Sequence, residues 1–274
     1  MRRCVQPYMP NISTQKNKAM HHDTLPKPKG FIFDYGGTID TRGCHWGKMI
    51  WHAYERHHVP VDEASYRDAY VYAERTLGRN PIIQSSYDFR TTLGVKLRIQ
   101  MEYLLEHNLL GASAPHDAEA MASELLDDLY SQVRQTVAES RTALETLSRE
   151  VPLVLVSNFY GNIGVVLHEM GLDGLFTSVV ESAVVGVRKP DPRIFSMGVE
   201  ALGLEPSQVV VVGDSYSKDI VAGSKAGCRT VWVRGEGWTA EEPDLTLPEA
   251  VVESISEIPL LYDMANKIYQ TINN

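Results

Sequence analysis

Short runs of apolar residues, rich in valine and isoleucine, constrain the fold of this chain more than any other feature. They are FIFD (31–34), PLVLVSN (152–158), QVVVVGD (208–214) and RTVWV (229–233), with TSVVESA (177–183) as a weaker candidate. The segments between them, such as DPRIFSMGVEALG (191–203), repeat apolar residues at helical spacing. Near-continuous apolar strands that alternate with helices are typical of a parallel sheet with both faces covered. We therefore predict an α/β fold built on a parallel sheet.

The interval from residue 42 to residue 139 has a different pattern. It is helix-like almost throughout, as in KMIWHAYERHH (48–58) and GVKLRIQMEYLLEH (94–107). We predict that residues 42–139 form a helical domain inserted after the first strand, and that residues 30–41 and 140–274 form the core. Residues 1–29 are polar, contain several prolines and show no period, which predicts a disordered extension.

Charge and cysteine content narrow the partners and the compartment. The formal net charge of -9 argues against a nucleic acid or an anionic membrane surface as a general partner. No run approaches the roughly 20 apolar residues that a membrane span requires. The cysteines Cys4, Cys44 and Cys228 are too scattered for a disulfide framework, which favours a reducing compartment. We therefore expect a cytoplasmic protein.

Polar residues stand where three of the predicted strands end. Asp34 closes the first, Ser157 and Asn158 close the second, and Asp214 closes the run QVVVVGD. Each has an ordinary structural explanation when taken alone, because such residues cap helices and form turns. Ligands of an open parallel sheet, however, gather at the carboxyl ends of its strands. The convergence of these residues on one edge therefore predicts a functional site.

The residue types at this edge indicate a particular chemistry. Asp34 can attack a phosphorus or carbon centre as a nucleophile. Asp214 and Asp219 can share a hard cation such as Mg²⁺ with it. Lys189, in GVRKPDPRIF, can place a positive charge against the group that is transferred. The paired glycines of DYGGT (34–38) let backbone N–H groups approach an anion closely.

The fragments DYGGT, VSN, RKPDPRIF and GDSYSKD, in this order, resemble the four motifs of the haloacid dehalogenase superfamily. The match spans roughly residues 31–235, and the helical block lies where that family carries its cap. The resemblance implies a Rossmann-like core and an α-helical cap that opens and closes over the active site. It also implies that Asp34 is the catalytic nucleophile that forms a covalent aspartyl intermediate, that Thr38 orients its carboxylate, and that Ser157 hydrogen-bonds the transferring group.

The resemblance further implies two sets of binding residues. The first set would contact the phosphate and comprises Gly36, Gly37, Ser157, Asn158 and Lys189. The second set would hold Mg²⁺ and comprises Asp34, the backbone carbonyl of Gly36, Asp214 and Asp219.

The chain departs from the family pattern at Gly36. Family phosphatases usually carry an acid there, which protonates the leaving group and later activates water. General acid–base catalysis is typically worth about 10²–10⁴ in rate, so its loss needs an explanation. One reading is a phosphatase whose substrate has a good leaving group, such as an acyl phosphate. Another is a proton donor lent by the cap, where the candidates are His45, His52, His57 and His58.

Three other readings remain open. A phosphonatase-like enzyme that cleaves carbon–phosphorus bonds would use Lys48 or Lys96 of the cap to form a Schiff base. A dehalogenase would carry a tyrosine where Phe195 stands and would lack the acids Asp214 and Asp219. A binding or regulatory module would hold Mg²⁺ and phosphate without turnover, although such proteins tend to lose several of the groups retained here.

We predict a Mg²⁺-dependent phosphatase that acts on a small phosphorylated metabolite. The cap would set the specificity of the enzyme for its substrate. Its most loop-like stretch is NPIIQSSYDFRTTL (80–93), so Arg79, Tyr87 and Arg90 are candidate substrate contacts. The sequence pattern does not determine the oligomeric state.

Overall fold

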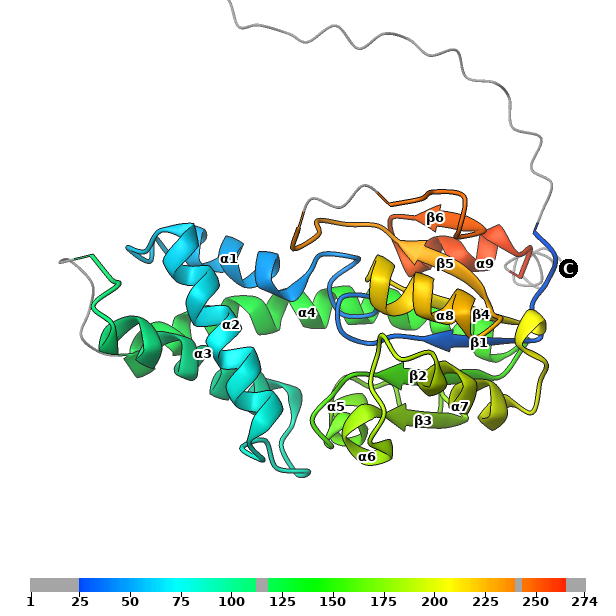
Figure 1. The fold of residues 1–274 in the computed structure, drawn as a ribbon, viewed down its shortest axis with the longest axis horizontal. Helices are drawn as coiled ribbons and strands as arrows, with labels where there is room; N and C mark the ends of the chain where they lie inside the picture. The colour runs from blue at the N-terminus through cyan, green and yellow to red at the C-terminus, as the bar shows by residue number, and fades with distance from the viewer. Residues whose placement is uncertain (1–24, 112–117, 240–242, 265–274) are drawn as a thin grey trace, which may run out of the picture.

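A parallel sheet forms the centre of the fold in the computed structural model, which describes residues 25–111, 118–239 and 243–264. Its six strands lie in the order β3-β2-β1-β4-β5-β6, and every neighbouring pair is parallel (Figure 1). The strands are β1 (Gly30–Phe33), β2 (Leu153–Ser157), β3 (Ser178–Glu181), β4 (Val209–Gly213), β5 (Arg229–Val233) and β6 (Ala250–Val252). The predicted α/β fold with a Rossmann-like parallel sheet is confirmed.

Alternate residues of each strand pack into two separate hydrophobic clusters, one on each face of the sheet. Phe31 and Phe33 of β1 belong to the first cluster, whereas Ile32 belongs to the second. This follows from strand geometry, in which successive side chains point to opposite faces. Strands covered on both faces need apolar residues at every position, which explains why their sequences read as continuous apolar runs.

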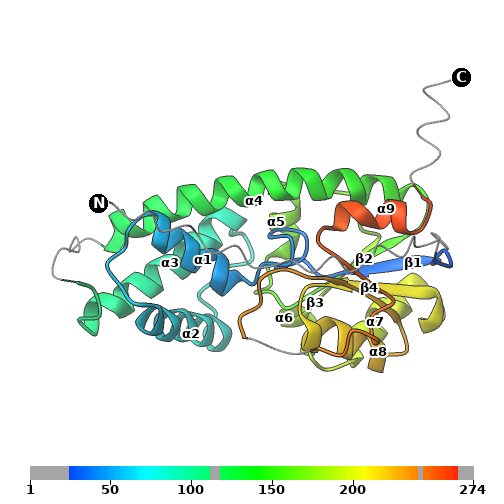
Figure 2. The same ribbon diagram turned by 90° about the horizontal axis from the view of Figure 1, so that it is seen from above.

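Helices cover both faces of the sheet. Helix α7 (Arg193–Leu202) supplies Ile194, Phe195 and Val199 to the second cluster. Figure 2 shows α7 and α8 on one side of the sheet, with α4, α5 and α9 on the other. The remaining elements of the core are α5 (Ile163–Glu169), α6 (Ser182–Val185), α8 (Ala222–Lys225), α9 (Ile258–Leu261), the short helices η1 (Pro206–Gln208) and η3 (Ile255–Glu257), and the π-helix η2 (Tyr216–Val221).

Four helices follow β1 and precede β2, as the sequence predicts. They are α1 (Trp46–Arg56), α2 (Glu63–Arg79), α3 (Phe89–Glu106) and α4 (Ala118–Ser148). Acidic side chains cap two of them. The Asp62 carboxylate accepts from the Ser65 backbone N–H of α2, and the Asp88 carboxylate accepts from the Thr91 backbone N–H of α3. Helices α1, α2 and α3 lie beyond the carboxyl ends of the strands (Figure 1).

Helix α4 runs without interruption from this helical layer to the sheet (Figure 2). The boundary predicted at residue 139 therefore falls inside a continuous helix. Of the predicted extension, residues 1–24 lie outside the described part of the chain. Residues 25–29 run beside the core, where the Lys29 backbone N–H donates to the Gln208 carbonyl at 2.8 Å. Within the described ranges, no helix has the length and apolar character needed to cross a membrane.

Candidate active site

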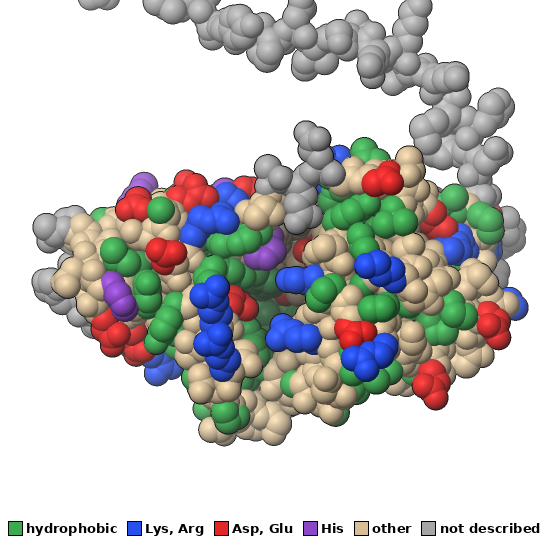
Figure 3. All heavy atoms as spheres, viewed as in Figure 1, with side chains coloured by type: hydrophobic (Ala, Val, Ile, Leu, Met, Phe, Trp, Pro, Cys, Tyr) green, Lys and Arg blue, Asp and Glu red, His purple; other side chains and the backbone are tan. Residues whose placement is uncertain are grey.

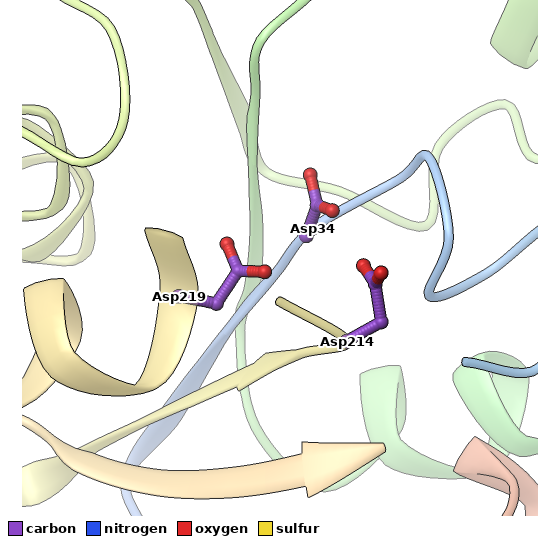
Figure 4. A group of neighbouring side chains, drawn as sticks. All are labelled: Asp34, Asp214 and Asp219. Atoms are coloured by element: carbon purple, nitrogen blue, oxygen red, sulfur yellow. The ribbon is translucent and has the colours of Figure 1, made fainter. Parts of the chain in front are cut away.

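Three carboxylates meet at the carboxyl edge of the sheet. Asp34 follows β1, Asp214 follows β4, and Asp219 lies on η2 directly after it. Figure 4 shows the three side chains beside one another. One oxygen from each carboxylate lies within 4.8 Å of the others. A π-helix often marks a functional position in a protein, and here it carries Asp219.

Lys189 is buried among these carboxylates. Its Nζ lies 2.6 Å from Asp34 Oδ1 and 2.7 Å from Asp219 Oδ1, and its side chain is 3% exposed. Burial acts to lower the pKa of Lys189, but the neighbouring carboxylates of Asp219 and Asp34 outweigh burial and hold the pKa above its usual value. Lys189 is therefore a permanent positive charge beside the predicted nucleophile.

Asn158 fixes the backbone from which Lys189 extends. Its side-chain Nδ2 donates to the Lys189 carbonyl at 3.0 Å, and its Oδ1 accepts from the Lys189 backbone N–H at 2.9 Å. The sequence predicts that Asn158 binds phosphate, but both polar atoms of its side chain form hydrogen bonds with the backbone of the loop 186–192. Ser157, at the end of β2, is buried and lines the same cavity as Lys189.

Thr38 joins the first and fourth strands. Its Oγ1 donates to Asp214 Oδ1 at 3.1 Å, accepts from the Asp214 backbone N–H at 2.9 Å and lies 3.5 Å from Asp34 Oδ2. The Trp232 indole donates to the Asp214 carbonyl at 2.7 Å. These bonds hold the carboxylates of Asp34 and Asp214 at a fixed separation.

The two glycines after Asp34 serve different needs. Gly37 has φ +99°, and a Cβ on it would lie 2.4 Å from the carboxylate of Asp214, so no larger residue fits. Gly36 has no such restriction, because a Cβ there would first meet Trp46 Nε1 at 3.7 Å. The fold therefore requires the second glycine but tolerates a side chain at the first.

The charges of the site suit a divalent cation. Three buried or part-buried carboxylates face a single ammonium group, Lys189. Burial and the charges of Asp219 and Asp34 raise the pKa of Asp214 well above its usual value, and burial raises the pKa of Asp219 to about 6. This mutual repulsion is what a bound cation relieves. The all-oxygen donor set fits Mg²⁺.

A cavity of about 180 Å³ lies between the strand ends and the helical layer. Figure 3 shows the hollow, with basic side chains around its rim. Its floor includes Asp34 and Lys189, and its roof includes Tyr70, Phe89 and Lys96. This arrangement agrees with the expectation that the helical insertion lies over the strand ends.

Lys96 is the cap lysine that reaches the cavity. Its Nζ lies 2.6 Å from Glu74 Oε1 on the neighbouring helix. Burial acts to lower the pKa of Lys96, but the charge of Glu74 outweighs it and raises the pKa. Lys48 pairs with Glu63 at 2.9 Å and does not line this cavity. Because a Schiff base requires a neutral amine, the phosphonatase-like reading loses support.

Of the four cap histidines proposed as proton donors, only His45 lines the cavity. Its Nδ1 accepts from the Gly47 backbone N–H at 3.0 Å, and burial lowers its pKa to about 4. His45 is therefore neutral at physiological pH and is a poor acid. His52 instead hydrogen-bonds Glu55 and Glu236 at the surface.

The predicted substrate contacts from the cap loop lie elsewhere. Arg90 pairs with Asp127, and neither Arg79 nor Tyr87 lines the 180 Å³ cavity. Two other cations do line it, Arg188 and Lys218. Neither has an acidic partner within 4.0 Å in the part of the chain that the structure describes. The adjacency of Arg188 to Lys189 was the only signal for this role in the sequence.

The fold and this cluster define a class of protein, in which a helical insertion covers a carboxylate cluster at the strand ends of a parallel α/β core. The chain belongs to the haloacid dehalogenase-like hydrolase family, whose family model matches residues 28–227. The resemblance inferred from the four motifs is confirmed.

Individual relatives support the same assignment. A phosphoserine phosphatase of Thermus thermophilus is 32% identical over 153 residues, which cover 53% of this chain and 57% of that relative. The chain thus spans little more than half of its length. Haloacid dehalogenase-like hydrolase domain-containing protein 3 of Mus musculus is 29% identical over 208 residues, 74% of this chain and 80% of the relative. The structure of the HAD-hydrolase YfnB from Bacillus subtilis shares the fold, with TM-score 0.54, 16% identity, and coverage of 86% of this chain and 99% of that one.

Proposed function

We propose that this hydrolase is a Mg²⁺-dependent phosphatase of a small phosphorylated metabolite, with Asp34 as its nucleophile. The observation that carries the proposal is the buried ammonium group of Lys189, 2.6 Å from Asp34 Oδ1 in the cavity under the helical layer. A buried cation beside a nucleophilic carboxylate can neutralise a phosphoryl group during its transfer. The similarity to a phosphoserine phosphatase supports this reaction class.

The residues of the chain define two chemical steps. In the first, an Asp34 oxygen attacks phosphorus in line with the leaving oxygen, and a covalent aspartyl phosphate forms. In the second, water attacks that phosphorus, releases phosphate and restores the Asp34 carboxylate. Thr38 and Lys189 position this carboxylate through the contacts described above. Ser157 lines the cavity where it can donate a hydrogen bond to a phosphoryl oxygen.

The residues that would hold Mg²⁺ are Asp34, Asp214, Asp219 and the carbonyl of Gly36. When bound, the ion would polarise the phosphoryl group and neutralise its charge. Thr38 restrains Asp214, and Lys189 restrains Asp34 and Asp219, so each carboxylate is oriented before any ligand arrives.

The substrate is small and anionic in this proposal. A cavity of about 180 Å³ is below the roughly 300–1,000 Å³ of drug-sized sites. Arg188 and Lys218 add positive charge at its wall, which offsets the overall acidity of the protein. Such local cations attract phosphorylated compounds to the site.

Phosphate release provides the test. Acetyl phosphate and glycerol phosphate would each be incubated with the wild-type protein and with Asp34→Asn, with and without Mg²⁺. We expect Mg²⁺-dependent release by the wild type and none by Asp34→Asn, because the amide cannot form the covalent intermediate. Full activity in that variant would refute the covalent mechanism.

Asp173→Asn is a matched control for the loss of one carboxylate. Asp173 pairs with His168 on the exposed surface, away from the cavity. Its variant should keep wild-type activity, which separates the loss of the nucleophile from a change in net charge. Mg²⁺ binding by a wild-type protein that releases no phosphate would instead favour a binding module.

A further inference from the structure

A second acid lies in the loop that carries the nucleophile. Asp40 follows Asp34 within the turn after β1 and is 1% exposed. It lines the same cavity as Asp34 and Gly36. Gly36, where the family's acid is missing, and the buried carboxyl of Asp40 therefore line the same cavity.

Trp46 connects these two positions. Its indole Nε1 donates to Asp40 Oδ2 at 3.0 Å, and the same nitrogen is the atom nearest to a Cβ on Gly36, at 3.7 Å. The carboxyl of Asp40 and the position that a side chain at residue 36 would occupy thus both lie next to Trp46 Nε1. The Gly37 backbone N–H donates to Asp40 Oδ1 at 2.6 Å and fixes the carboxyl in this place.

The proposal rests on the proposed phosphatase function. We infer that Asp40 performs the proton transfers that Gly36 cannot perform. As the bond between phosphorus and the leaving oxygen breaks, that oxygen takes the bond electrons and a proton from the Asp40 carboxyl. As water then attacks the aspartyl phosphate, the Asp40 carboxylate accepts a proton from the water. The bond from phosphorus to the Asp34 oxygen breaks, and both carboxyl groups return to their starting states.

The environment of Asp40 suits a group that both gives and takes a proton. Burial, the largest influence, raises its pKa to about 7, while the N–H groups of Gly37 and Trp46 act to lower it and the charge of Asp34 acts to raise it. The charge of Asp40 also helps to raise the pKa values of Tyr35 and Cys44, for which burial is the largest cause. A carboxyl with a pKa near the working pH is an efficient general acid and base.

A purely structural role for Asp40 makes a different prediction. If the carboxyl only braced the turn, its loss would lower the rate on every substrate by a similar factor. A proton donor matters in proportion to the basicity of the leaving group. An alcohol released from glycerol phosphate needs the proton, whereas acetate released from acetyl phosphate hardly does.

The experiment compares the wild type with Asp40→Asn and with the double variant Gly36→Asp/Asp40→Asn. The comparison is made in the first turnover, because the later hydrolysis of the aspartyl phosphate is common to both substrates. We expect Asp40→Asn to lower the rate of glycerol release from glycerol phosphate by about 10²–10⁴ and to change the rate of acetate release from acetyl phosphate by less than about tenfold. The double variant should regain activity on glycerol phosphate, because the Cβ added at residue 36 meets nothing closer than 3.7 Å. Equal losses on both substrates, or no loss on glycerol phosphate, would overturn the inference.

Trp46→Phe gives a second readout that does not depend on the folding of the Asp40 variant. It removes an N–H donor that stabilises the ionised carboxyl and so should raise the pKa of Asp40. The first step requires protonated Asp40, so activity falls as pH rises through this pKa. The alkaline limb of the plot of activity against pH, measured with glycerol phosphate, should therefore move to higher pH. An unmoved limb would refute the inference, and a wild type without phosphatase activity would remove both it and the proposed function.

Discussion

The two adjacent glycines after Asp34, the proposed nucleophile, offer a sharp test of the structure. Gly37→Ala forces a Cβ onto a residue with φ +99° and places it 2.4 Å from the Asp214 carboxylate. Left-handed backbone costs a non-glycine residue roughly 1–2 kcal/mol, and overpacking adds about 1–3 kcal/mol. The free energy of unfolding should fall by roughly 2–5 kcal/mol, a large share of the usual ~5–15 kcal/mol. Urea denaturation followed by circular dichroism measures the change as a lower midpoint with an unaltered slope.

Gly36→Ala is the matched control, since its Cβ has room and its backbone is not in the left-handed region. A glycine replaced at a compatible position typically stabilises a protein by about 0.4–1 kcal/mol. The midpoint of this variant should therefore equal or slightly exceed that of the wild type. Similar midpoints for the two alanine variants would show that the loop does not have the described geometry.

Two further predictions concern residues that line the cavity. Arg188→Gln should raise KM for an anionic substrate by about tenfold or more with little change in kcat, since hydrogen bonds to charged groups contribute about 1.5–3 kcal/mol. Steady-state kinetics would show this, and an unchanged KM would remove Arg188 from the binding site. Asn158→Ala should lower kcat by up to about 10²-fold, because Lys189 loses both side-chain contacts to its backbone and a small misplacement has that effect. A wild-type kcat would show that Lys189 is held by its two carboxylate partners alone.

The sheet could be predicted because its strands are buried on both faces and each reads as an apolar run. Strand β6 was missed, since Ala250–Val252 is too short for any pattern to distinguish it from a loop. Asp34, Thr38, Ser157, Lys189 and the two acids after β4 could be named because they stand in ordered motifs at strand ends. The structure brings them together at one edge.

The rest of the site depends on tertiary packing. Glu74 and Lys96 meet only because α2 packs against α3, and no spacing along the chain encodes that pair. Backbone conformation is equally invisible in the sequence, so the different demands on Gly36 and Gly37 could not be separated. Asp40 was visible in DYGGTID, but its burial against Trp46 was not.

The uninterrupted course of α4 has a mechanical consequence. Its 31 residues extend about 45 Å and tie the helical layer to the sheet as a single rod. Of the two chain crossings between these layers, only the one over residues 34–45 lacks a helix, so we expect that crossing, and not α4, to take up any rotation between the layers. That crossing contains Asp40 and ends where Trp46 opens α1. Any swing of the layer would thus change the separation of a carboxyl and an indole that now share a hydrogen bond.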